Sequence, residues 1–277
     1  MRGVMMCALG ACICSGARSQ GYNWVEAASP EIEKDLRFTL GTHYFNDASF
    51  GFSGLEGDLY GAAWIEARHA PADNVELFFS CTIRKYLSVD RILGADGSAF
   101  LDQPVAPGQT RQATGDFSLF TKWRVYGAKD SFALALLTGF TQPNTNLSSG
   151  MGLDIGSLHG RMLLDATFRR FSFSGNIGAS LSNNPTVRGQ DDFFTFGLGA
   201  AVDASRRLLF AGEVYGMYAG NDGPGDGLID SLNLALGAVI HTNPIDITLT
   251  SISYLEDFGP ASGFRLRLSR EFAIGRK

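Results

Sequence analysis

Long apolar runs are missing from this sequence. One of the longest, residues 132–140, is interrupted by Thr138 and Gly139. A membrane-spanning helix needs about 18 or more apolar residues in succession. The sequence therefore argues against a helical membrane protein.

Cysteine is almost absent beyond the first twenty residues. Cys7, Cys12 and Cys14 precede that point, and Cys81 alone follows it. A single thiol cannot form an internal disulfide, so no disulfide framework is expected. Cys81 falls on the apolar face of a predicted strand, where it is expected to act as a small hydrophobic side chain.

Charge is also scarce, at 18% of the residues, with a formal net charge of -5. Soluble domains carry about 25% charged residues. A negative chain is not expected to bind nucleic acid. The hydrophobic share of 45% suits strands that show one face to lipid and the other to water.

The first residues have the layout of an export signal: Arg2, a short apolar stretch, and then small residues. Cleavage after Ala17 or Ser19 fits the small-x-small rule, and lipidation at Cys12 is the alternative. We predict three parts: a signal peptide over 1–19, a periplasmic N-terminal segment over 20–34, and an outer-membrane β-barrel over 35–277.

Twelve segments alternate apolar and polar residues with period two, which predicts β-strands of the length that crosses a bilayer when tilted. Unpaired backbone groups cost several kcal/mol in hydrocarbon, so the strands must close on themselves. The fold class predicted is all-β, a transmembrane antiparallel up-and-down barrel of about twelve strands. The expected strands are 35–45, 58–68, 75–86, 114–126, 131–141, 157–168, 171–181, 193–202, 208–218, 230–241, 246–256 and 263–272.

The connections alternate in length. Long ones such as 87–113 are rich in Gly, Asn, Asp and Pro, and each is followed by a short one such as 127–130 or 169–170. Long loops outside and short turns in the periplasm are typical of bacterial outer-membrane barrels. We expect the 87–113 connection to fold over or into the barrel mouth, with Ile92, Leu93, Phe100 and Leu101 as apolar anchors.

Polar and charged side chains share the face opposite the apolar one, which in a membrane barrel is the lumen. Both signs occur, so the pattern predicts no obvious anion or cation selectivity. Contact with a solute and ion pairing that fills a narrow barrel both remain open interpretations. The candidate lumen-lining residues are Tyr60, Trp64, Arg84, Asp116, Lys122, Arg124, Arg161, Asp165, Glu213, Arg265 and Arg267; Arg37, Asp58, Glu66, Arg68, Glu76, Glu271, Phe78, Phe120 and Tyr215 share their parity.

One hairpin carries a resemblance. It runs from Gly115-Asp116 through Lys122-Trp123-Arg124 and a short turn to an apolar strand that ends at Pro143. It resembles the outer-membrane family associated with the meta-pathway of phenol degradation, and the segment 150–156 is similar to that family's next segment. The resemblance implies a transporter or channel for small, often hydrophobic or aromatic compounds.

The function predicted is passive passage of such compounds across the bacterial outer membrane. The alternatives are a closed structural barrel in a larger assembly and an outer-membrane lipid hydrolase. We predict no catalytic residues, since no Ser and His motif of the phospholipase kind occurs, and no metal ligands or cofactor. The expected partners are outer-membrane lipid, lipopolysaccharide and a small-molecule solute; an oligomer or an assembly partner stays open.

Overall fold

The computed structural model describes residues 36–50, 55–92, 101, 104–127, 131–142, 144, 149, 151, 156–184, 189–219, 231–255 and 262–273. Within them the chain forms thirteen strands. These are β1 Leu36–Phe50, β2 Leu55–Ala72, β3 Val75–Ile92, β4 Thr110–Ala113, β5 Phe117–Gly127, β6 Phe132–Gln142, β7 Ser157–Phe168, β8 Phe171–Asn184, β9 Gly189–Ser205, β10 Leu208–Ala219, β11 Ser231–His241, β12 Asp246–Tyr254 and β13 Ser262–Phe272.

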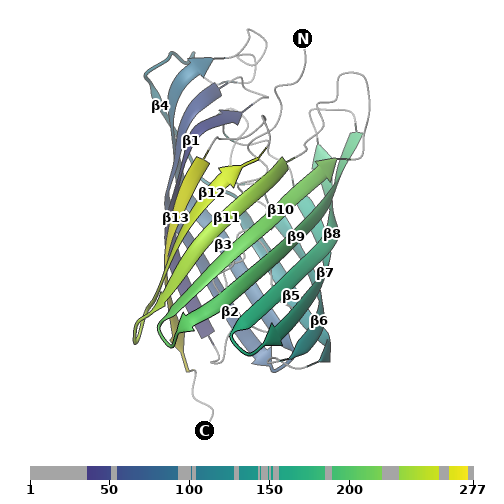
Figure 1. Cartoon of the computed structure of the whole chain (residues 1–277). Helices are drawn as coiled ribbons and strands as arrows, with labels where there is room; N and C mark the ends of the chain where they lie inside the picture. The colour runs from purple at the N-terminus through teal and green to yellow at the C-terminus, as the bar shows by residue number, and fades with distance from the viewer. Residues whose placement is uncertain are drawn as a thin grey trace.

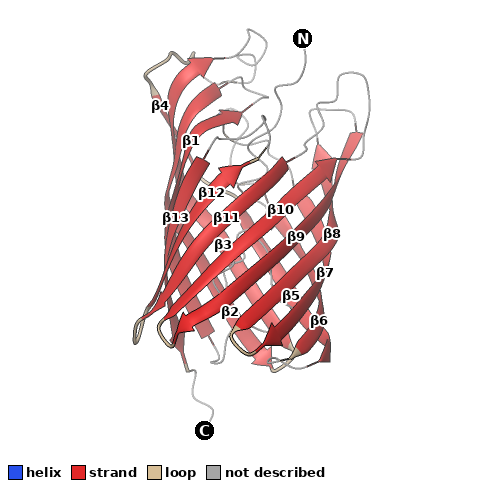
Figure 2. Cartoon of the chain, viewed as in Figure 1, coloured by secondary structure: helices blue, strands red, loops and turns tan. Residues whose placement is uncertain are grey.

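Twelve of these strands close into one antiparallel barrel, which confirms the predicted fold class (Figure 1). Each pairs with its sequence neighbours, and β1 pairs with β13 from Leu36↔Phe272 to Asn46↔Ser262. The strands tilt across the barrel wall (Figure 2). We call the end with the short connections the turn end and the opposite end the loop end. Short turns lie on the periplasmic side of bacterial outer-membrane barrels, so we expect the turn end to face the periplasm.

The fourth predicted strand, 114–126, corresponds to β5, and a short additional strand, β4, precedes it inside the predicted 87–113 connection. β3 pairs with β5 over Val75–Cys81 and with β4 over Lys85–Ser88. Between β4 and β5 the chain leaves the ladder, although the Gly115 N–H still donates to the Thr82 carbonyl at 2.7 Å. β1, β2 and β3 also extend further toward the loop end than predicted, and they stand above the other strands in Figure 1.

Exposed and buried side chains alternate along most strands, as the period-two pattern predicts. On the outer face large apolar residues are exposed along every long strand, for example Leu40, Phe79, Met162 and Leu249. Aromatic residues gather on this face near the turn end, where a barrel meets the lipid head groups. They are Trp123, Tyr126, Phe132, Phe168 and Phe171.

The segments 1–19 and 20–34, proposed as signal peptide and N-terminal segment, lie outside the described residues. No helix within the described ranges is long and apolar enough to cross a membrane.

Candidate functional site

Most of the predicted lumen residues are on the buried face of their strands, which in a closed barrel is the inner face. None of the following exceeds 6% exposure: Trp64, Lys122, Arg161, Asp165, Glu213, Arg265 and Arg267. Asp116, directly before β5, and Arg124, near the turn end of β5, are half-buried. Asp116 accepts a hydrogen bond from the Asn144 N–H at 3.0 Å, and Arg124 donates to the Asp73 carbonyl at 3.0 Å. Whether these side chains contact a solute stays a prediction.

Tyr60 and Arg84 are not on the lumen face. Tyr60 pairs with Tyr44, which pairs with the exposed Phe264, so all three share the outer face. Arg84 is exposed and donates to Gln112 at 3.4 Å. The expectation for these two residues was therefore wrong.

The cause is a pair of bulges. The register shifts between Gly61 and Trp64 on β2 and across Arg84 on β3, so each strand gains one residue. An extra residue reverses which side chains point inward. Beyond the shift Lys85 is buried in place of Arg84. Asp58, on the same parity as Tyr60, accepts a hydrogen bond from the hydroxyl of Tyr44 at 2.7 Å.

Four charged side chains form an ionic cluster on the inner face beside the short β2–β3 connection. Arg68 donates to Glu66 at 2.6 Å and to Glu76 at 3.2 Å. The other oxygen of Glu76 lies 2.5 Å from the Lys122 ammonium. All four side chains are fully buried, and two cations balance two carboxylates. Burial of charge is tolerated when the charges are paired in this way.

An aromatic row continues from this cluster across the lumen wall. The Arg68 guanidinium lies 4.4 Å from the centroid of the Phe78 ring. Phe78 stacks on Phe120 at 5.0 Å, and Phe120 lies 5.4 Å from the His159 ring. The residues come from β2, β3, β5 and β7 and lie along one line of paired positions, in which β6 contributes Gly139.

His159 joins the aromatic row to a chain of hydroxyl groups. Its Nδ1 lies 2.7 Å from the Ser180 Oγ, and its Nε2 lies 2.9 Å from the Thr141 Oγ1. Thr141 in turn contacts Ser118 at 2.8 Å. The sequence places His159 on the polar face of its strand but gives no sign of these partners, because they lie on three other strands.

Gly139 is the position that lets the aromatic row form. A Cβ there would lie 2.3 Å from the Phe120 ring and 2.5 Å from the Leu119 carbonyl oxygen. We expect G139A to displace Phe120 and to lower the free energy of unfolding by about 1–3 kcal/mol, the cost of overpacking. Gly160 is the matched control, since a Cβ there meets nothing within 4 Å. Urea unfolding in lipid vesicles measures both variants; equal stability of G139A and G160A would contradict the packing argument.

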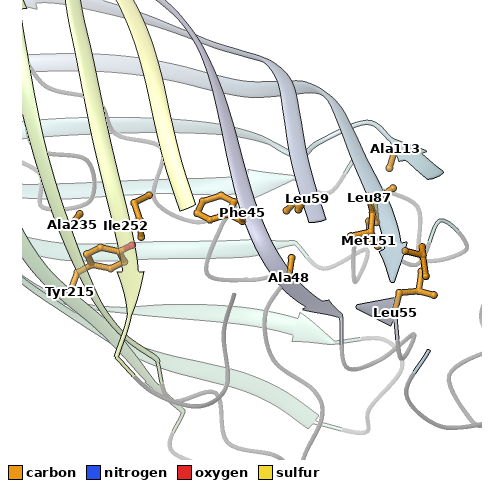
Figure 3. Packing of buried hydrophobic residues seen from close by; sticks show 11 residues of the cluster. Phe45, Ala48, Leu55, Leu59, Leu87, Ala113, Met151, Tyr215, Ala235 and Ile252 are labelled. Atoms are coloured by element: carbon orange, nitrogen blue, oxygen red, sulfur yellow. The ribbon is translucent and has the colours of Figure 1, made fainter. Parts of the chain in front are cut away.

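The loop end of the lumen is lined differently, by a cluster of buried apolar residues (Figure 3). Phe45, Leu59 and Leu87 come from β1 to β3, while Tyr215 comes from β10 and Ile252 from β12. Ile92 and Leu101 pack against the cluster, in agreement with their predicted role as anchors of the 87–113 connection. The other two predicted anchors, Leu93 and Phe100, lie outside the described residues.

Within the described ranges, no group of three His, Cys, Asp or Glu side chains is placed to hold a metal ion.

Three kinds of surface line the described part of the lumen wall. From the turn end to the loop end these are paired charges, stacked aromatic rings with hydroxyl groups, and apolar side chains.

Comparison with known proteins shows the fold and no closer relationship. No protein-family model matches the chain, and no curated protein matches it. The resemblance of the Gly115 to Pro143 hairpin to the phenol-degradation family therefore stays a prediction.

Solved structures of outer-membrane barrels do match. An outer-membrane channel from Pseudomonas putida F1 has a TM-score of 0.60 at 12% identity, over 87% of this chain and 97% of that one. The NanC porin has a TM-score of 0.54 at 7% identity, over 86% and 100%. The KdgM porin, solved with disordered oligogalacturonate, has 0.53 at 7%, over 85% and 99%. The chain therefore has the fold of bacterial outer-membrane β-barrels.

Proposed function

We propose that this barrel is an outer-membrane channel for the passive passage of small compounds, aromatic ones among them. The observation that carries the proposal is the aromatic row, Arg68, Phe78, Phe120 and His159, on the inner wall. A barrel interior that only had to be filled would not need three rings from three strands packed in a row beside a guanidinium. Aromatic faces beside a guanidinium and hydroxyl groups favour planar solutes with polar substituents.

The apolar cluster at the loop end supports the same proposal. A solute that enters from outside meets apolar side chains before it reaches the aromatic row and the ionic cluster. The fold is shared with an outer-membrane channel and with two porins. A twelve-stranded barrel is wider than one of eight strands, whose side chains fill the interior, and narrower than a sixteen-stranded porin.

A closed structural barrel is the second candidate, and the burial of the lumen charges favours it. Arg68, Glu76 and Lys122 are fully buried, so inner side chains must give way before a solute passes. A lipid hydrolase finds less support. The hydrogen bond between Ser180 and His159 faces the lumen, whereas cleavage of lipid requires such a pair on the lipid-facing wall.

Conductance of the refolded protein in planar bilayers separates the first two candidates. We expect a small but measurable single-channel conductance that aromatic acids reduce when they occupy the lumen. A barrel without conductance under any voltage would leave the structural role in place of the channel.

The aromatic row makes a sharper prediction. We expect F120A to weaken the block by aromatic acids about tenfold, because one ring–solute stack contributes about 1 kcal/mol or more. Phe140 is the matched control, since it is exposed on the outer face of the neighbouring strand. We expect aromatic acids to block F140A as strongly as the wild type. Equal block of F120A and the wild type would remove the aromatic row from the solute pathway.

A further inference from the structure

The inner face of the described strands is positively charged, although the whole chain has a formal net charge of -5. The buried cations are Arg37, Arg68, Lys85, Lys122, Arg161, Arg265 and Arg267, and the buried carboxylates are Glu66, Glu76, Asp165 and Glu213. Glu271, half-buried beside Arg37, is a fifth carboxylate. Together these seven cations and five carboxylates have a net charge of +2.

Four of the five carboxylates lie near the turn end, and the fifth, Glu213, lies in the middle of β10. Glu66 and Glu76 belong to the ionic cluster with Arg68 and Lys122. Glu271, one residue from the end of β13, pairs with Arg37 at the start of β1. Asp165, near the end of β7, accepts a hydrogen bond from the Ser174 hydroxyl at 2.6 Å.

β13 carries two cations further along the lumen. The residues paired with Arg265 are Thr250 on β12 and His43 on β1, and those paired with Arg267 are Thr248 and Gly41. Three of these four paired residues are uncharged, and the fourth is a histidine. In the described parts of β11 and β12, and of β1 from Gly41 to Phe45, the one carboxylate is that of Asp246, half-buried at the turn end of β12.

Arg265 and Arg267 form a basic surface, which Lys85 extends to β3; we call these three residues the basic wall. The line of paired positions runs from Arg265 through His43 and Gly61 to Lys85. The His43 ring lies over Gly61, where a Cβ would come within 2.2 Å of it. His43 is thus paired with Arg265 on one side and is separated from Lys85 by Gly61 alone on the other. Lys85 reaches the lumen only because the β3 bulge exchanges it with Arg84.

We propose that the lumen selects anions, with Arg265 and Arg267 as the residues that set the selectivity. The inference rests on the proposed channel function and names its solute class: small anions, with carboxylates of aromatic compounds as the best fit to the aromatic row. Charged walls of low dielectric focus the field in a narrow lumen, so a small excess of one sign biases which ion enters.

The test is the reversal potential of the refolded wild-type barrel across a KCl gradient. We expect chloride to permeate about threefold or more better than potassium at about 0.1 M salt. The ratio should fall toward one at about 1 M, where the screening length shrinks to about 3 Å.

Three variants assign the selectivity to the basic wall. R265Q/R267Q should bring the permeability ratio close to one, while R265K/R267K, which keeps both charges, should retain it. R270Q is the matched control from the same strand, because Arg270 is exposed on the other face and lies over Phe272. Its ratio should equal that of the wild type. Heat-modifiable migration in gels reports whether each variant folds.

The outcomes separate this inference from the function on which it rests. Absence of conductance in the wild type overturns the channel and the selectivity together. Conductance that favours potassium, or neither ion, overturns the selectivity and leaves the channel standing. The wild-type measurement alone decides this, even if the glutamine variant fails to fold.

Discussion

R68A is expected to destabilise the barrel by about 3–5 kcal/mol, the usual cost of removing one partner from a buried ion pair. Arg68 holds Glu66 through two hydrogen bonds, at 2.6 and 3.3 Å, and Glu76 through a third at 3.2 Å. Without the guanidinium, two fully buried carboxylates lose a paired cation. The variant also leaves the Phe78 ring without its cation.

Urea unfolding in lipid vesicles, followed by gel migration, measures the loss. E66Q/R68M is the informative second variant: it removes a cation and a carboxylate together and keeps the Glu76–Lys122 pair. It should recover most of the lost stability, since neutral replacement of a buried pair is often tolerated. R84A is the surface control and should change stability by less than about 0.5 kcal/mol, because Arg84 is exposed. Equal losses for R68A and R84A would refute the role of the ionic cluster.

The sequence was sufficient to predict the barrel because alternation of side chains and alternation of loop lengths are both local patterns. Parity along a strand also placed Lys122, Arg161 and Arg267 on the inner face. The rule fails where the strand gains a residue. The bulges in β2 and β3 moved Tyr60 and Arg84 to the outer face, and no proline or glycine pair marks the shift in the sequence.

The contacts of the lumen could not be predicted for a different reason. The aromatic row joins residues of β2, β3, β5 and β7, and its order depends on the register between strands. Register is set by the whole closed sheet, so a single strand does not contain it. Gly139 looks like an interruption of an apolar run in the sequence, whereas in the structure it makes room for Phe120.

The outer face makes the second large prediction. Met162 is exposed near the middle of β7, where the surrounding side chains of that face are apolar. We expect M162R to lower the free energy of unfolding by about 2–4 kcal/mol in a bilayer, because an arginine at the bilayer midplane loses its hydration. Refolding into vesicles across a urea series measures this loss.

Phe168, on the same face at the turn end of β7, is the matched position for the same substitution. It lies beside Arg169, whose guanidinium is 5.3 Å from its ring, so this depth already carries a cation. F168R should cost about 0–1 kcal/mol, since the penalty for arginine falls toward the membrane interface. A larger stability cost for M162R than for F168R would place the hydrocarbon core around the middle of β7. Equal costs at both depths would mean that this face is not surrounded by lipid, and the transmembrane placement of the barrel would have to be abandoned.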